Sequence, residues 1–152
     1  MMKLGIRTLV VITALTLGGS AWAQDVFIAH LNGASQVPPF DTLAQGQFVG
    51  RLRQTGNLSY KLNVANLENV VAAHIHCGAP GANGPVGVTL FLGAPVSVNG
   101  TLAQGPILAP DPNNGCGWLD VDDVLDALES GDTYINAHTL QSLPGEIRGQ
   151  VN

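Results

Sequence analysis

Apolar and polar residues alternate in short runs along most of the chain. In the clearest run, residues 58–64, the apolar set is Leu58, Tyr60, Leu62 and Val64, and the polar set is Ser59, Lys61 and Asn63. A period of two is typical of a β-strand with one buried and one solvated face. The run at 47–53 precedes it across Gln54-Thr55-Gly56-Asn57, so the two runs predict a β-hairpin.

Strand patterns recur through the rest of the chain, and glycine or proline marks the junctions between them. The predicted strands are residues 26–31, 47–53, 58–64, 70–76, 86–92, 96–102, 133–139 and 146–151. Val37-Pro38-Pro39 cannot donate to a central ladder, so that segment predicts an edge or a loop. The pattern indicates about eight strands.

Only residues 120–131 depart from this period. Val121, Val124, Leu125 and Leu128 share one helical face, acidic residues fill the first turn, and Gly131 stands at the end. A helix this short is marginal alone, so its apolar face is expected to dock on the sheet. The chain therefore predicts an all-β fold, an antiparallel Greek-key sandwich or flattened barrel with one short helix.

The N-terminus has the pattern of a secretory signal peptide. Lys3 and Arg7 precede the apolar run 9–15, which is too short to span a bilayer, and Ala21-Trp22-Ala23 offers small residues for cleavage. We expect a leader at 1–23, one domain at 24–152, and a periplasmic or extracellular product without a membrane span.

The predicted mature segment is acidic. It has four basic and eleven acidic residues, a formal net charge of −7. Nucleic acid is not an expected partner, because phosphate binding needs a cationic surface; a protein or another extracellular ligand is expected instead. The acidic residues at 111 and 120–132 indicate a solvated face, with a weak cation-attracting surface as the alternative.

The chain has two cysteines, Cys77 and Cys116. In an oxidising compartment such a pair favours a disulfide, which would close a loop of about 40 residues. A Cys77 thiolate that binds metal is the alternative. Strand parity weighs against it, because Cys77 directly follows His76 and would point to the other face.

Three of the four histidines lie in two segments, His74-Ile75-His76 and Asn136-Ala137-His138. Residues two apart on a strand project on the same side, about 6.5 to 7 Å apart, so two imidazoles can reach one metal ion. The apolar set Val71, Ala73 and Ile75 is expected to face the core, which places the histidines on the opposite face. The glycine- and proline-rich segment 78–85 is the expected cover.

Several spaced motifs resemble the CHRD (chordin) domain family. They are Ala73-His74-Ile75-His76-Cys77-Gly78, Gly81-Ala82-Asn83-Gly84-Pro85-Val86, the segment 131–139, and Pro144-Gly145-Glu146-Ile147-Arg148-Gly149-Gln150-Val151. The resemblance covers the whole predicted mature chain. It implies a domain of the kind found in the animal antagonist chordin and in stand-alone exported bacterial proteins, generally without an established biochemical role.

A looser resemblance is to copper/zinc superoxide dismutases, which also place a His-x-His pair on one strand, a third copper ligand on a late strand, and an arginine nearby. His74, His76, His138 and Arg148 would take those positions. The chain lacks the histidine-rich loop of a dinuclear site. Three neutral imidazoles suit copper or zinc, and water, His30 or Glu146 could supply a fourth ligand.

Each of these polar residues also has a purely structural interpretation. The three histidines and Asn136 could form an ordered polar network with the loop. Glu146 and Arg148 share parity, so a cross-strand ion pair is the simplest expectation for them, and guidance of an anionic ligand is the alternative.

Two functions remain consistent with the sequence. The first is an exported binding or structural module, non-enzymatic, with a loop-covered copper or zinc site. The second is a mononuclear metal-dependent redox enzyme that resembles superoxide dismutase.

Overall fold

The computed structural model describes residues 25–152, so the predicted leader at 1–23 and its cleavage site lie outside the described residues. Six strands and one helix make up this part of the chain. The strands are β1 (Val26–Asn32), β2 (Gln45–Leu52), β3 (Leu58–Cys77), β4 (Val86–Ile107), β5 (Thr133–Thr139) and β6 (Ile147–Gln150). The helix is α1 (Val121–Ser130), and a short 3-10 turn, η1, spans Gly33–Ser35.

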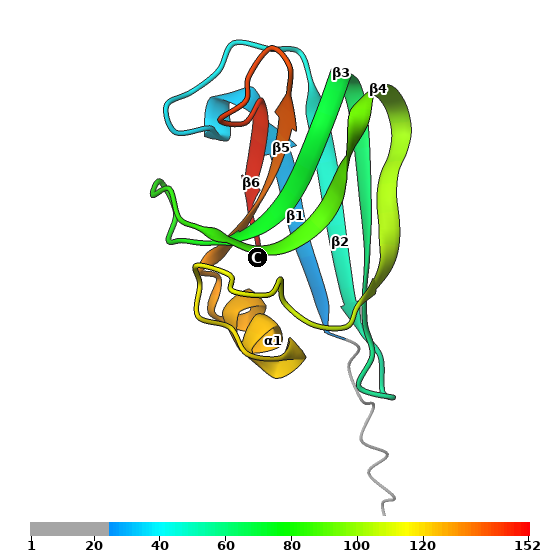
Figure 1. Cartoon of the computed structure of the whole chain (residues 1–152), viewed down its shortest axis with the longest axis vertical. Helices are drawn as coiled ribbons and strands as arrows, with labels where there is room; N and C mark the ends of the chain where they lie inside the picture. Colours follow the sequence, from blue (N-terminus) through cyan, green and yellow to red (C-terminus); the bar gives the residue numbers. More distant parts are fainter. Residues whose placement is uncertain (1–24) are drawn as a thin grey trace, which may run out of the picture.

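The strands form one antiparallel sheet that closes into a barrel (Figure 1). The order is β2-β1-β6-β5-β3-β4, and a further pairing of β2 with β3 completes the ring. The all-β prediction is confirmed, and of the two architectures expected the structure is the barrel. Strand β4 pairs with β3 alone, so it extends the sheet along one edge of β3, and its side chains Val88, Leu90 and Ile107 still contribute to the core.

The prediction of eight strands is wrong, because two expected pairs are each one long strand. Residues 58–64 and 70–76 both belong to β3, and residues 86–92 and 96–102 both belong to β4. The register between β3 and β4 shifts at several β-bulges between Leu62 and His76. Asn66 and Asn69 take the left-handed conformation there, at φ 54° and 52°, which asparagine tolerates better than most residues. The bulges interrupt the alternation of side chains and disrupt the ladder locally, but the strand continues through them.

Strand β3 changes neighbours along its length. Its first half pairs with β2, from Leu52↔Leu58 to Gln45↔Ala65, whereas its second half pairs with β5, from Val70↔Thr139 to Cys77↔Thr133. Bulges bend and twist a strand locally, so the bend in β3 helps to close the barrel.

The hydrophobic core fills the barrel interior. It includes side chains from all six strands, among them Phe27, Phe48, Leu62, Ile75, Val88, Ile135 and Ile147. Leu62, Ile75 and Ile135 are completely buried. Residues 71, 73 and 75 were expected to face the core, and Ala73 and Ile75 do. Val71 does not, because the register shift between Val70 and Ala72 brings Val70 inward instead.

The predicted helix is confirmed together with its ends. Asp120 is the N-cap, and its carboxylate accepts hydrogen bonds from the backbone N–H groups of Asp122 and Asp123. Gly131 ends the helix in the left-handed conformation. Val124 and Leu128 are buried, so α1 docks its apolar face on the barrel as expected.

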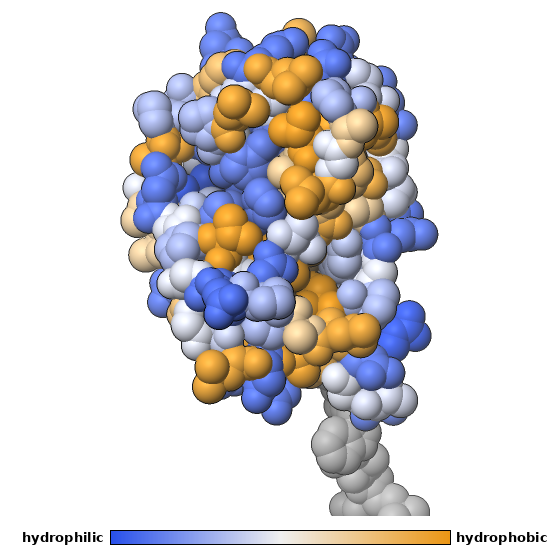
Figure 2. All heavy atoms as spheres, viewed as in Figure 1, coloured by the Kyte–Doolittle hydropathy of each residue, from blue (hydrophilic) through white to orange (hydrophobic). Residues whose placement is uncertain are grey.

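The surface mixes hydrophilic and hydrophobic residues on the face shown in Figure 2. Several exposed leucines lie outside the strands, namely Leu43, Leu108, Leu119, Leu140 and Leu143. Within residues 25–152, no helix has the length and apolar character needed to cross a membrane.

Candidate metal centre

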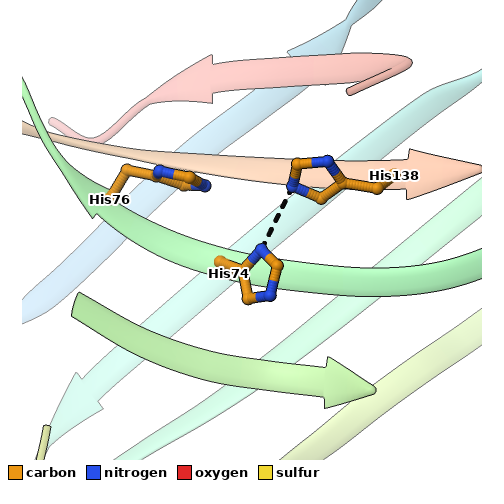
Figure 3. A group of neighbouring side chains, drawn as sticks. All are labelled: His74, His76 and His138. Atoms are coloured by element: carbon orange, nitrogen blue, oxygen red, sulfur yellow. Dashed lines mark hydrogen bonds between the residues drawn. The ribbon is translucent and has the colours of Figure 1, made fainter. Parts of the chain in front are cut away.

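Three histidines from β3 and β5 converge on the outer face of the barrel (Figure 3). The two strands pair so that His76 lies opposite Tyr134, His74 opposite Asn136, and Ala72 opposite His138. His138 is therefore a diagonal neighbour of His74 across the ladder. One ring nitrogen from each histidine lies within 4.8 Å of the others, so the structure brings together the three histidines that the sequence grouped as one candidate site.

Backbone carbonyls orient two of the three rings. Nδ1 of His76 lies 2.9 Å from the carbonyl oxygen of Gly84, and Nδ1 of His138 lies 2.8 Å from that of Leu143. Because a carbonyl oxygen only accepts, both Nδ1 atoms carry the proton and donate. Each neutral ring then presents an unprotonated Nε2.

The ring of His74 faces the cluster with Nδ1, whereas His76 and His138 face it with Nε2. Nδ1 of His74 lies 3.1 Å from Nε2 of His138. Because Nε2 of His138 is unprotonated, His74 is the donor in this pair. Nε2 of His76 is buried and has no hydrogen-bond partner among the described residues, and Figure 3 shows this ring edge turned toward the other two rings. An unpaired buried nitrogen is costly unless another group uses it.

Burial keeps these rings neutral. It lowers the pKa of His76 and that of His138, and it is the largest cause that lowers the pKa of His74 to about 4. Mutual repulsion between the imidazolium forms adds to the effect at His74, and the carboxylate of Asp111 opposes it. Neutral imidazole is the form that binds metal, so the lowered pKa values favour the binding form.

The three histidines offer imidazole nitrogens, a donor type that copper and zinc accept. Two nitrogens bound to one tetrahedral ion at about 2.0–2.1 Å lie about 3.3 Å apart, and the 3.1 Å between His74 and His138 already matches this. An ion at the centre would replace the proton on Nδ1 of His74 and occupy the free Nε2 of His76. Imidazole ligands favour zinc, copper and related metals over magnesium or calcium.

The segment 78–85 covers one side of the cluster, as its composition predicted. The hydroxyl of Tyr134 lies 3.0 Å from the backbone nitrogen of Gly84, which donates to it, and 3.2 Å from the carbonyl oxygen of Gly84. Gly84 itself leaves no room for a side chain, since a Cβ there would collide with the carbonyl of Cys77. The same Gly84 carbonyl orients His76, so the position of the loop fixes the ring.

Arg148 supports this cover instead of facing solvent. It is 2% exposed, its guanidinium carbon lies 3.4 Å from the centroid of the Tyr134 ring, and its nitrogens donate to the carbonyl of Ala82 and the side chain of Asn83. His76 stacks on Tyr134 with a centroid separation of 4.7 Å. Arg148 thus contacts the cluster through Tyr134 and the loop.

The expected ion pair between Glu146 and Arg148 is not formed. Glu146 precedes β6 and is 4% exposed, and its carboxylate accepts hydrogen bonds from the hydroxyls of Thr42 and Thr139 at 2.7 and 2.6 Å. The parity argument placed Glu146 on the strand with Arg148, but the chain turns before Ile147. Glu146 therefore ties the loop before β2 to the end of β5.

Two further candidates lie outside the cluster. Asn136 accepts a hydrogen bond of 2.8 Å from the side chain of Gln36, and it donates to the carbonyl of Pro144. His30 is exposed on β1 opposite Gln47 and lines a separate shallow groove with Asn63. Neither is among the residues that converge.

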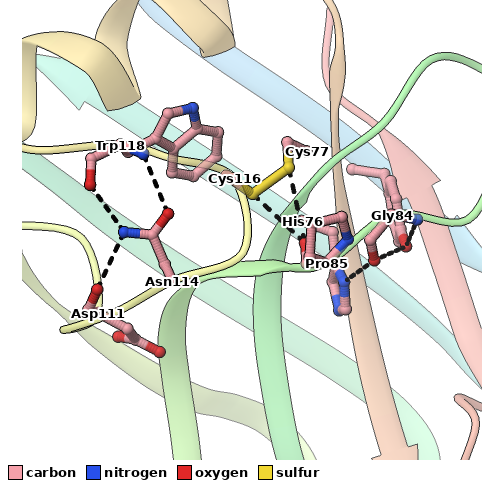
Figure 4. The surroundings of a disulfide bond; sticks show 9 residues. His76, Cys77, Gly84, Pro85, Asp111, Asn114, Cys116 and Trp118 are labelled. Carbon is pink, nitrogen blue, oxygen red and sulfur yellow. Dashed lines mark hydrogen bonds between the residues drawn. A yellow bond between two sulfur atoms is a disulfide. The ribbon is translucent and has the colours of Figure 1, made fainter.

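The disulfide between Cys77 and Cys116 is present, with its Cα atoms 5.8 Å apart (Figure 4). The prediction is confirmed, and a thiolate of Cys77 as a metal ligand is excluded in this state. The bond joins the end of β3, next to His76, to the segment before α1. Asn114 orders that segment through hydrogen bonds with Trp118 and the carbonyl of Asp111.

The sequence interpretation missed the partners that orient the rings. The carbonyls of Gly84 and Leu143 are backbone groups, which carry no residue signature. Tyr134 shares the face of Asn136 and His138, and its place opposite His76 becomes evident only with the register between β3 and β5.

A closed antiparallel barrel with a covered three-histidine cluster on its outer face defines a small β-barrel domain with a candidate mononuclear metal site. The CHRD domain model matches residues 27–151. The chain therefore belongs to the CHRD domain family. No curated protein and no solved structure matches the chain.

Proposed function

We propose that this protein is an exported, non-enzymatic binding module that holds one copper or zinc ion through His74, His76 and His138. Export is supported by the predicted leader and by the disulfide, which is typical of oxidising compartments. Membership of the CHRD family is consistent with an extracellular module.

One observation carries the metal proposal. The buried Nε2 of His76 has no hydrogen-bond partner within residues 25–152, and it lies beside two other ring nitrogens whose orientation is fixed. Ligating histidines typically donate their second ring N–H to a carbonyl or carboxylate, which is how His76 and His138 are arranged. A polar network alone would be expected to engage Nε2 of His76.

Metal titration of the chelator-treated protein tests the proposal. The wild type should bind one equivalent of Cu(II) or Zn(II), and Cu(II) should bind more tightly, following the general order of divalent metals. His76→Ala and His138→Ala should each weaken binding by more than about 100-fold, because loss of a ligand should exceed the effect of an outer-shell change. His30→Ala is the matched control, since this histidine is exposed and lies elsewhere, and it should bind as the wild type does. Equal binding by all four proteins would refute the proposed site.

A mononuclear redox enzyme is the second candidate function. Three protein ligands leave a coordination position for a small molecule, and His74 and His138 are only half-buried. Superoxide dismutation by the copper-loaded protein would support this candidate. A stoichiometric copper protein without that activity would leave the binding role.

A further inference from the structure

His74 differs from the other two histidines in how its ring is oriented. His76 and His138 use Nδ1 to bond a carbonyl and present Nε2 to the cluster, whereas His74 presents Nδ1. When a metal replaces the proton on Nδ1, the neutral ring must carry its proton on Nε2. A group that accepts this proton would hold the ring in the binding orientation.

Thr89 carries a hydroxyl beside His74 on the neighbouring strand. It is the residue of β4 directly opposite His74 in the register of β3 and β4. Directly opposite residues of an antiparallel pair share a face, with Cβ atoms about 4.5–5.5 Å apart. Figure 3 shows the second nitrogen of His74 on the side of the ring away from His138. Thr89 therefore lies on the same face of the sheet as His74, on the adjacent strand.

Asp111 orients the Thr89 hydroxyl so that its oxygen can accept a hydrogen bond. Its carboxylate receives the Thr89 hydroxyl proton at 2.6 Å and the Thr89 backbone N–H at 2.9 Å. With its proton committed to Asp111, the hydroxyl oxygen keeps its lone pairs available.

The segment that carries Asp111 is fixed at several points. The backbone N–H of Asp111 donates to the carbonyl of Gly87 at 2.8 Å, Asn114 bonds the carbonyl of Asp111, and Cys116 is linked to Cys77 (Figure 4). The carboxylate is thus held over β4 without help from a metal.

We infer that Thr89 and Asp111 act as a positioning pair for His74, in which Thr89 accepts the Nε2 proton and Asp111 polarises the hydroxyl. This inference rests on the proposed metal site. Thr89 and Asp111 are not ligands. They stabilise the ring tautomer that binds metal through Nδ1.

Substitution of Thr89 tests the pair, with zinc as the metal so that nitrogen NMR can report the ring tautomers. Thr89→Val and Asp111→Asn should each weaken Zn(II) binding by about 10-fold or more, within the range typical of outer-shell partners. Thr89→Ser keeps the hydroxyl and should restore binding to within about threefold of the wild type. In zinc-loaded wild type, His74 should carry its proton on Nε2, and His76 and His138 should carry theirs on Nδ1.

Thr101→Val is the matched control. Thr101 also lies on β4, opposite Asn63 of the first half of β3, and it donates to that side chain at 2.9 Å. This variant should bind zinc as the wild type does, and thermal unfolding should show that all variants fold. Stoichiometric zinc in the wild type with unchanged affinity in Thr89→Val and Asp111→Asn would overturn the positioning pair alone. A wild type that binds no zinc would overturn the pair together with the proposed function.

Discussion

The two halves of β3 share an inner face and differ on the outer one. In the first half, Leu58, Leu62 and Val64 are buried in the core; in the second half, Ala73 and Ile75 are. The outer positions of the first half include the exposed Lys61, whereas those of the second half are the half-buried His74 and the 6%-exposed His76. One strand thus contributes to the core along its length but to the candidate site only in part.

The difference arises from the neighbours of each half. The first half lies between β2 and β4, and Lys61 on its outer face is exposed. The second half lies beside β5, which contributes Tyr134 and His138, and beneath the segment that Arg148 and Tyr134 hold in place. Burial of polar side chains on the outer face therefore depends on what covers the sheet, not on strand alternation.

The largest expected effects come from the shared inner face. Leu62→Ala and Ile75→Ala should each lower the free energy of unfolding by about 2–5 kcal/mol, because both side chains are completely buried. Denaturant unfolding in the presence of a chelator measures this without a metal contribution. If Ile75→Ala lowered the free energy of unfolding by less than about 1 kcal/mol while Leu62→Ala lowered it by about 2–5 kcal/mol, the second half of β3 would not be part of the same core.

The disulfide should distinguish the two halves of β3, because it anchors only the second half, which ends at Cys77. Cys77 and Cys116 are 39 residues apart, and in the chain-entropy model a cross-link of this span contributes about 2–4 kcal/mol. The Cys77→Ala/Cys116→Ala double variant should lose this amount in denaturant unfolding. Reductant should destabilise the wild type and leave the stability of the double variant unchanged. An equal response of both proteins would contradict the presence of the disulfide.

Sequence patterning predicted the local elements better than their continuity. The alternation in 58–64 and the capped helix at α1 each follow from local side-chain chemistry, and both are present. The continuity of β3 through Asn66 and Asn69 was not predictable, because a bulge breaks the side-chain period while the strand continues. A break was likewise predicted between residues 92 and 96, yet Pro95 there lies within β4, a strand that pairs on one edge only.

The same limits apply to the candidate site. Parity was sufficient to place His74, His76 and His138 on one face, because the register of β3 with β5 is unbroken from Ala72↔His138 to Cys77↔Thr133. Parity failed for Glu146, which lies just before β6 and turns toward Thr42 and Thr139. The partners of the rings are carbonyls or residues from other strands, so they depend on register and loop closure.

The smallest predicted effect is a pH dependence of the free energy of unfolding that arises in the second half of β3. The pKa of His74 is lowered from 6.5 to about 4 in the folded protein, first by burial and then by repulsion from His138. Between these values the unfolded chain binds more protons than the folded one, so the free energy of unfolding rises with pH. The contribution of His74 to the free energy of unfolding is fully present above about pH 6.5 and is lost as the pH falls toward about 4.

His74→Gln removes this contribution and provides the comparison. After allowance for solvent screening of a partly exposed group, the His74 contribution to the pH dependence is about 1–2 kcal/mol. Denaturant midpoints of the chelator-treated proteins between pH 4 and 7 should therefore fall less steeply in His74→Gln than in the wild type. Part of the slope should remain, because the pKa values of His76 and His138 are lowered as well. Parallel slopes in the two proteins would mean that His74 is solvated like the outer positions of the first half, and the contrast between the halves would then rest on His76 alone.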